Sequence, residues 1–222
     1  MELIEALRSR RSIRAFKPDP VPRKVLEELL DICRWSPSSR NTQPWEFAIL
    51  GGKVMEEFKA GLTDKVKTEA AMERDMPEPE LSGPYLQRAM KQRELVDTAQ
   101  FHHRTEKLDK KRTEYWIRGG RFHDAPNGII VYMERSLYPA GLLGIGMILQ
   151  TISLAALAYG LGTCHTGRVV YWPNIVRELL DIPQSKMILH GIAIGYPVPE
   201  APINNFVRQR EPLDSMVHWY GV

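Results

Sequence analysis

An arginine-rich cluster near the start of the chain consists of Arg10, Arg11, Ser12 and Arg14. Guanidinium groups carry paired N–H donors whose spacing matches the oxygens of a phosphate or carboxylate, and the serine hydroxyl adds another donor. The cluster therefore indicates a binding site for an anion. Taken alone, such a run is more often a basic turn exposed to solvent.

A second arginine pair, Arg208 and Arg210, lies far along the chain in the stretch NNFVRQREPLD. Alternate side chains of an extended segment point to the same side, so this pair has the spacing to grip one anion. Taken alone, the two arginines would be interpreted as surface charges.

A polar loop is predicted at 36–44, where the sequence SPSSRNTQP has prolines near both ends. Its hydroxyl and amide groups suit the polar edge of a flat heterocycle or a polyol chain, held beside a buried strand. Considered alone, the segment is a polar turn.

A glycine-rich stretch, GLGTCHTGR, occupies 160–168. Glycines let a ligand ring approach the backbone and leave amide N–H groups available as donors. The GxGxxG order is absent, so this is not a dinucleotide fingerprint. A helix cap followed by a strand is the alternative interpretation.

The histidines and Cys164 are weaker candidates for chemistry. His102 and His103 lack acidic or cysteine partners, and we predict that they are surface groups. His165, inside the glycine-rich stretch, is the better candidate to touch a substrate, although packing is the commoner role. Cys164 is predicted to be a small buried hydrophobe.

Apolar periodicity predicts the elements that must position these residues. We expect a short amphipathic helix at the N-terminus, further helices at 22–34, 53–66, 142–161 and 173–180, and strands at 45–50, 127–133, 161–166 and 187–194. Strands separated by helices predict a mixed α+β or α/β sandwich.

Two segments lack the apolar residues that a core needs. The stretch 68–118 is densely charged and is predicted to form exposed helices or a mobile lid. From Pro197 onward four prolines and no helical period predict an extended arm, which needs a surface to lie on.

Composition limits the class of protein. The chain has 222 residues, 43% of them hydrophobic, which is enough for one sizeable core, and we expect one domain. A formal net charge of +3 does not indicate a nucleic-acid partner. Cys33 and Cys164 are the only cysteines, with no CxxC pair or Cys/His cluster, which favours a reducing compartment and no metal site.

The stretch 142–161 is apolar enough to raise the question of a membrane span. Gln150, Thr151 and Ser153 interrupt it, so we predict a core helix or a subunit contact rather than a membrane segment. The N-terminal MELIEALRSRRS lacks the features of a signal peptide. We therefore expect a cytoplasmic protein.

Together and in this order, the motifs resemble the FMN-dependent nitroreductase family. The matching stretches are RRSIRAF, SPSSRNTQPWEF, DAPNGIIV, GLGTCHTG and NNFVRQREPLDSMVHW. The resemblance implies an α+β nitroreductase-like sandwich with a central mixed, mainly antiparallel sheet flanked by helices, in an intertwined homodimer. Residues 1–222 would form a single FMN-binding domain, with 65–118 as a variable lid insertion and 197–222 as a C-terminal dimer arm.

The resemblance also implies roles for individual residues around FMN. Arg10, Arg11 and Ser12 would hold the phosphate and ribityl chain with Arg208 and Arg210, and Arg14 would reach the N1/O2 edge of the ring. Pro37, Ser38, Ser39 and Asn41 would come from the partner subunit, and the backbone of Thr166 and Gly167 would approach N5. The family often has an acidic residue near Gly167, where this chain has Thr166 and Arg168.

The implied activity is a ping-pong transfer of hydride from NADH or NADPH, through FMN, to a small conjugated acceptor such as a nitroaromatic or quinone. No catalytic side chain is required, because flavin N5 carries the chemistry. Two alternatives stay open: a flavin-dependent reductive dehalogenase or related flavin enzyme of the same fold, and an FMN-binding protein without turnover.

Overall fold

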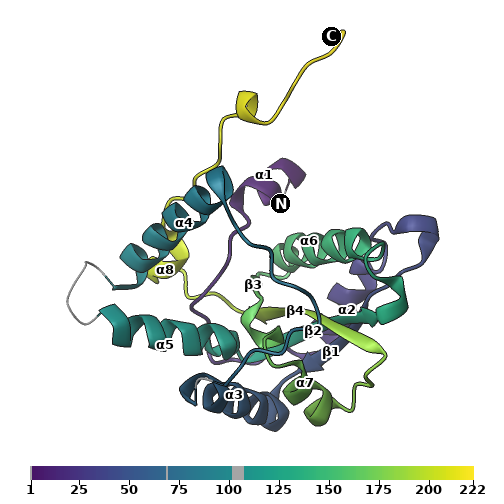
Figure 1. The fold of residues 1–222 in the computed structure, drawn as a ribbon, viewed down its shortest axis with the longest axis vertical. Coiled ribbons are helices and arrows are strands. Elements are labelled where there is room, and N and C mark those ends of the chain that lie inside the picture. The colour runs from purple at the N-terminus through teal and green to yellow at the C-terminus, as the bar shows by residue number, and fades with distance from the viewer. Residues whose placement is uncertain (1, 69, 102–107) are drawn as a thin grey trace.

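A four-strand antiparallel sheet lies at the centre of the computed structural model, which describes residues 2–68, 70–101 and 108–222 (Figure 1). The strands are β1 (Glu46–Leu50), β2 (Asn127–Glu134), β3 (Gly162–Thr166) and β4 (Lys186–Gly195), in the order β1-β2-β4-β3. His102 and His103 lie outside the described residues, so their predicted surface position is not tested.

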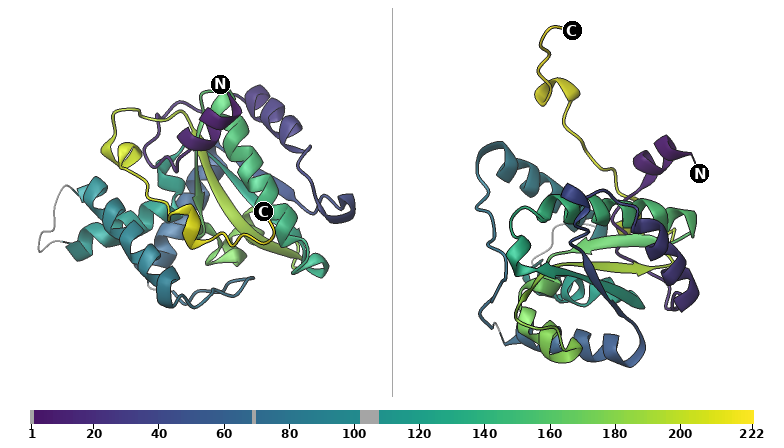
Figure 2. Two further views of the ribbon diagram at one scale, coloured as in Figure 1. Left: turned by 90° about the horizontal axis from the view of Figure 1, so that it is seen from above. Right: turned by 90° about the vertical axis from the view of Figure 1, so that its right-hand side faces the viewer.

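Helices cover both faces of the sheet (Figure 2). On one face lie α2 (Arg23–Cys33) and α6 (Leu142–Ala158), and on the other lie α3 (Gly52–Lys67) and α7 (Pro173–Leu180). Successive residues of β2 alternate between the two cores: Ile129 and Val131 pack toward α2 and α6, whereas Ile130 packs toward α3. The central strands are therefore buried on both sides, which explains their continuous apolar sequences.

The apolar helix α6 is a core helix, as predicted. Ile145, Ile148 and Ile152 are buried against the sheet. The helix ends at Ala158, and Gly160 follows with a φ of +67°, a conformation that glycine adopts easily. In the part of the chain that the structure describes, no helix is both long and apolar enough to cross a membrane.

Parallel pairing is confined to one isolated bridge in the described structure. The N-terminal helix α1 (Leu3–Ser9) leads into an extended segment, where Ser12 forms a parallel bridge to Thr163 of the edge strand β3. The four strands themselves pair antiparallel, so the sheet is less mixed than the sequence analysis expected.

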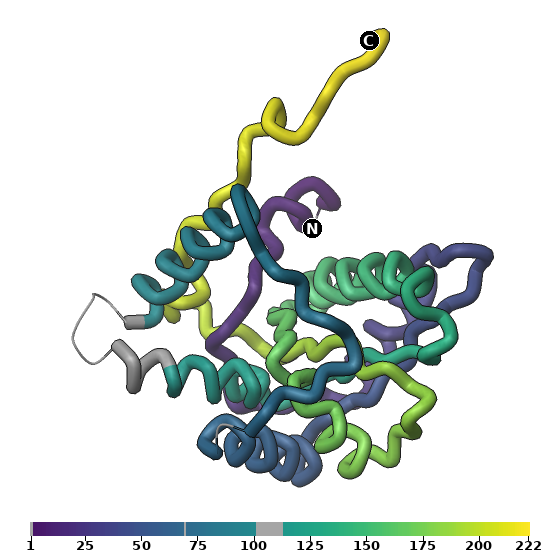
Figure 3. Tube along the Cα trace, viewed as in Figure 1, coloured from purple at the N-terminus to yellow at the C-terminus, as the bar shows by residue number. Residues whose placement is uncertain are grey.

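The charged insertion forms two helices, α4 (Gly83–Phe101), which is largely exposed, and α5 (Leu108–Gly120), whose C-terminal part is partly buried. The segment before α4 crosses the molecule on its way from α3 (Figure 3). Asp75 fixes this segment because its carboxylate pairs with Arg177 and with Arg135, at 2.9 Å, and accepts the N–H of Ile188 at 2.8 Å.

The C-terminal end of α5 is also anchored to the body. Arg168 donates to the carbonyl oxygen of Tyr115 at 2.9 Å, and its guanidinium lies 4.8 Å from the ring centre of Trp116. Arg118 donates to the carbonyl oxygen of Arg14 at 3.3 Å. The insertion is thus held at both ends by polar contacts that hydrophobic patterning does not reveal.

The C-terminal segment leaves the body after a short helix, α8 (Pro202–Asn205), and its last residues project into solvent (Figure 1). A single turn at Leu213–Ser215 interrupts its extended path. The large apolar side chains of this part are 59–95% exposed: Leu213, Met216, Trp219, Tyr220 and Val222. The arm therefore carries apolar surface that its own chain does not cover.

Candidate functional site

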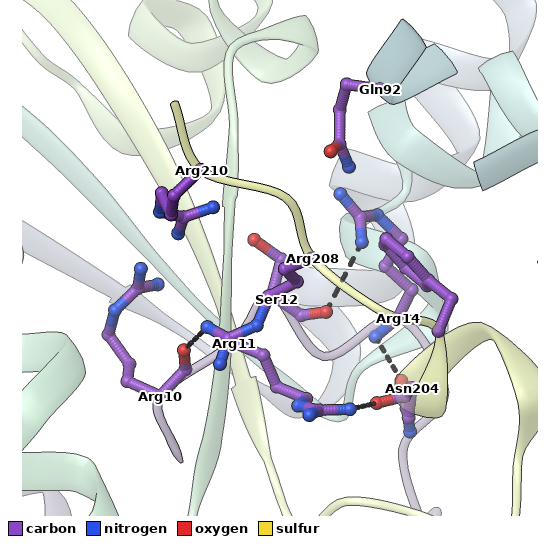
Figure 4. Close-up of a pocket in the computed structure, with 9 residues that line it drawn as sticks. Arg10, Arg11, Ser12, Arg14, Gln92, Asn204, Arg208 and Arg210 are labelled. Atoms are coloured by element: carbon purple, nitrogen blue, oxygen red, sulfur yellow. Dashed lines mark hydrogen bonds between the residues drawn. The ribbon is translucent and has the colours of Figure 1, made fainter. Parts of the chain in front are cut away.

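Five arginines from the two ends of the chain line one cavity of about 280 Å³ (Figure 4). Its lining comprises Arg10, Arg11, Ser12, Arg14, Gln92, Asn204, Phe206, Arg208 and Arg210. No carboxylate is among these residues, so the cavity concentrates positive charge. The structure brings together both arginine clusters that the sequence analysis singled out.

Asn204 joins the two ends of the chain beside the cavity. Its buried side-chain oxygen accepts the backbone N–H of Arg14 at 2.8 Å and of Ala15 at 3.2 Å. Its amide nitrogen donates to the carbonyl oxygens of Ala15 and Val198, both at 2.9 Å. Arg11 also donates to the backbone oxygen of Asn204, at 2.6 Å. All the hydrogen-bonding groups of this amide hold the arginine segments in register.

The edge strand β3 fixes the other side of the N-terminal segment. The N–H of Ile13 donates to the carbonyl oxygen of Thr163 at 2.9 Å. A Cβ atom at Gly162 would lie 2.6 Å from the Ile13 side chain, so only glycine permits this approach. Part of the glycine-rich stretch therefore provides the surface on which the segment from Arg10 to Arg14 packs.

The arginines of the cavity have few acceptors of their own. Arg208 donates to the carbonyl oxygens of Arg8 and Arg10, and Arg14 donates to that of Ser12 at 3.3 Å. Burial, and then the charges of Arg11, Arg210 and Arg10, lower the pKa of Arg208. The buried Nε atom of Arg10 has no hydrogen-bond partner. An anionic ligand would relieve the repulsion among the guanidinium groups and supply them with acceptors, so these residues fit a phosphate group.

Thr166 and Gly167 do not line the cavity. The buried Thr166 side chain donates to the carbonyl oxygen of Gly119 at 2.8 Å, which ties β3 to the end of α5. Gly167 is exposed, and a Cβ atom there would meet open space. The neighbouring Arg168 is committed to the last carbonyls of α5, a favourable place for a cation.

The polar loop lies against α6 rather than at the cavity. Ser38 contacts Gly144 closely enough that a Cβ atom at Gly144 would be 3.3 Å away. The Ser38 hydroxyl accepts the N–H of Gln43 at 2.9 Å, and Asn41 has a φ of +56°. Pro37, Ser38, Ser39 and Asn41 are therefore not part of their own chain's arginine cavity.

His165 is a packing residue beneath α6. It lies 2.7 Å from the hydroxyl of Ser153, and its ring centre is 5.1 Å from that of His190. Burial lowers the pKa of His190 to about 4, and burial together with the neighbouring His190 and Arg10 lowers that of His165 to about 4. Both imidazoles are consequently neutral near pH 7, and neither lines the cavity.

Known proteins of similar sequence identify the family of this chain. The model of the nitroreductase family matches residues 7–196. The chain belongs to the nitroreductase family. It is 30% identical to the 4-nitrobenzoate reductase of Pseudomonas putida, over 96% of this chain and 93% of that protein. It is 32% identical to the chloronitrobenzene nitroreductase of Comamonas testosteroni, over 95% of this chain and 93% of that protein.

Solved structures agree with this assignment. The FMN and NADPH-dependent nitroreductase NfnB from Sphigopyxis sp. strain HMH superposes with a TM-score of 0.94 at 25% identity, over the whole of both chains. The resemblance drawn from the motifs and the α+β fold that it implied are confirmed.

Three cavity residues of this nitroreductase were missed by the sequence analysis: Gln92, Asn204 and Phe206. Asn204 and Phe206 belong to the motif NNFVRQREPLD, so their position a few residues before the arginine pair was a signal that could have been used. Gln92 lies in the charged insertion, where no pattern distinguishes it from other exposed residues.

Proposed function

We propose that this nitroreductase is an FMN-dependent oxidoreductase that passes hydride from NADH or NADPH to a nitroaromatic or a similar small conjugated acceptor. The observation that carries the proposal is the arginine cavity, formed by both ends of a chain that belongs to this family. Relatives named for the reduction of 4-nitrobenzoate and chloronitrobenzene support the choice of acceptor.

The FMN phosphate is proposed to bind between Arg10, Arg11, Ser12, Arg208 and Arg210. The crowded guanidinium groups support this position, because a phosphate ester brings negative charge and several acceptor oxygens. Arg14 is assigned to the N1/O2 edge of the ring by family resemblance.

When bound, FMN supplies two-electron chemistry, taking hydride from the nicotinamide and giving it to the acceptor in turn. The chain's own residues would position the cofactor and compensate its negative charge. Arg14 offers a positive charge where negative charge develops on the flavin ring. The hydrogen bond between Ile13 and Thr163 of β3 fixes the position of the segment that carries Arg14. Since the Thr166 side chain is committed to Gly119, we propose that only backbone amides of residues 166–167 serve the ring.

We also propose a homodimer in which the arm 197–222 lies over the partner and the loop 36–44 completes the partner's site. The apolar side chains of the projecting arm support this, as do the exposed Leu3 and Ile4 of α1. Covering a large apolar side chain stabilises an interface by about 1.5–3 kcal/mol. The position of Ser38 and Asn41 away from their own chain's cavity is consistent with a role in another subunit.

Anaerobic stopped-flow mixing tests the proposed reaction. The purified protein should be yellow, and NADH or NADPH should bleach its flavin absorbance. Addition of 4-nitrobenzoate should then restore the colour while a reduced product forms. A colourless protein, or a bound flavin that stays oxidised with either nicotinamide, would contradict the proposal.

A further inference from the structure

The insertion helix α4 turns one face toward the arginine cavity. Arg88, Gln92 and Val96 are spaced four residues apart, which places them on the same side of a helix. Arg88 pairs with Glu211 of the C-terminal arm at 3.6 Å, and Val96 is buried. Gln92, between these two attachments, reaches the cavity itself.

The Gln92 amide has no hydrogen-bond partner among the residues that the structure describes, although it can both donate and accept. Figure 4 shows this amide pointing toward the guanidinium of Arg14, on the side of the cavity away from Arg10. Within residues 2–68, 70–101 and 108–222, the Arg14 guanidinium donates a hydrogen bond only to the carbonyl oxygen of Ser12, at 3.3 Å. Two polar groups from separate parts of the chain thus face one space without a direct bond.

We propose that Gln92 is a specificity-determining contact for the ligand of the arginine cavity, and that this contact couples α4 to occupancy of the cavity. The proposal rests on the proposed function and takes FMN as the ligand. A ligand oxygen would accept from the Gln92 amide and from Arg14 together, so α4 and the N-terminal segment become joined through the ligand. A neutral amide suits this position because it adds a donor without adding charge to five guanidinium groups.

The ion pair and the exposed side chains of α4 hold this helix weakly, so a contact between Gln92 and a ligand can change its stability. The Arg88 and Glu211 side chains are 44% and 42% exposed, and ion pairs in contact with solvent contribute little to stability. Tyr85, Leu86 and Met90 on the same helix are exposed. One additional hydrogen bond would therefore add to the packing of α4 against α8 in holding this helix.

FMN titration of the flavin-free protein, followed by quenching of flavin fluorescence, measures the contact. Gln92→Ala should weaken FMN binding about three- to tenfold, the loss of one hydrogen bond. Gln92→Glu should weaken it more than about tenfold, because the new carboxylate pairs with Arg14 and repels the ligand. Gln87→Ala and Gln87→Glu are matched controls on the exposed surface of the same helix, and both should bind FMN as the unmodified chain does.

Hydrogen exchange along α4 provides a readout independent of activity. FMN should slow exchange in α4 of the unmodified chain and of Gln87→Ala, but not of Gln92→Ala. Binding by Gln92→Glu as tight as by Gln87→Glu, or equal protection of α4 in Gln92→Ala, would overturn this inference and leave the proposed function intact. An unmodified chain that binds no FMN would overturn both.

Discussion

Individual arginines dominate the chemistry of the cavity. Five guanidinium groups face a space of about 280 Å³ with no carboxylate among the lining residues, and the pKa of Arg208 is lowered by burial and by its arginine neighbours. Such an arrangement opposes folding until an anion is present, because like charges repel at short range. Cofactor binding and local stability are therefore linked in this part of the molecule.

Replacing Arg208 and Arg210 together with alanine tests this link. We expect the double variant to retain less FMN through purification, with affinity reduced about a hundredfold or more, since hydrogen bonds to charged groups contribute about 1.5–3 kcal/mol each. The flavin-to-protein absorbance ratio and a fluorescence titration measure the loss. Arg23→Ala plus Arg34→Ala removes the same charge from exposed ion pairs and should leave FMN binding unchanged. A fully flavinated Arg208/Arg210 variant would refute the assignment of the pair.

The sequence was informative for these side chains because arginine clusters are recognisable from residue type alone. Their convergence was inferred from family resemblance and not from spacing, since Arg10 and Arg208 meet only through the tertiary fold. Asn204 escaped notice because its importance depends on three hydrogen bonds to the backbone of Arg14 and Ala15, which are distant in sequence. Cys164, in contrast, is buried as predicted, and burial raises the pKa of its thiol.

At the scale of helices and strands, apolar periodicity located the core elements closely. The predicted helix at 173–180 coincides with α7, and the strand predicted at 187–194 extends by one residue at each end. Both are governed by burial against neighbours that are also apolar, so their patterns are strong. The anchors of the insertion were missed because Asp75 and Arg168 bind partners that are distant in sequence.

The packing of β3 and β4 beneath α6 makes stability depend on pH. His165 and His190 have pKa values lowered to about 4 mainly by burial, whereas an unfolded histidine titrates near about 6.5. Between about pH 6.5 and about pH 4 the unfolded chain therefore takes up protons that the folded chain does not. The contribution of these histidines to the free energy of unfolding is fully present above about pH 6.5 and is lost as the pH falls toward about pH 4.

A leucine in place of His190 should reduce this dependence. Between about pH 7.5 and about pH 5, the free energy of unfolding should fall by about 2 kcal/mol less than in the unmodified chain, as measured by urea unfolding. His218→Gln, in the exposed arm, serves as the control and should change nothing. An unaltered pH dependence in His190→Leu would show that this imidazole is charged or solvated in the folded protein.

For the molecule as a whole, the exposed apolar side chains of the C-terminal arm are the feature that contacts within one chain do not explain. The sequence predicts an extended segment that needs a surface to lie on, and in the structure five large apolar side chains within residues 211–222 are exposed to solvent. The local pattern of the arm carries no information about which surface would cover it, because that surface is not adjacent in sequence. The homodimer consequently remains a prediction.

Deleting residues 211–222 tests the assembly while keeping Arg208 and Arg210. The complete chain should have twice its 25.5 kDa monomer mass in analytical ultracentrifugation, and the shortened chain should dissociate toward monomer. Val54→Ser, an exposed apolar position on α3, is expected to leave the mass unchanged. A monomeric complete chain, or a shortened chain that dimerises equally well, would rule out the proposed role of the arm.

The joining of residues 10–14 to residues 204–210 also bears on biosynthesis. During translation Arg14 leaves the ribosome well before Asn204, the asparagine that holds it in register, which lies 190 residues further along the chain. Domains can begin to fold while the ribosome is still extending the chain. This cavity cannot form until both segments have been made, so it takes shape later than the parts of the fold whose contacts are local in sequence.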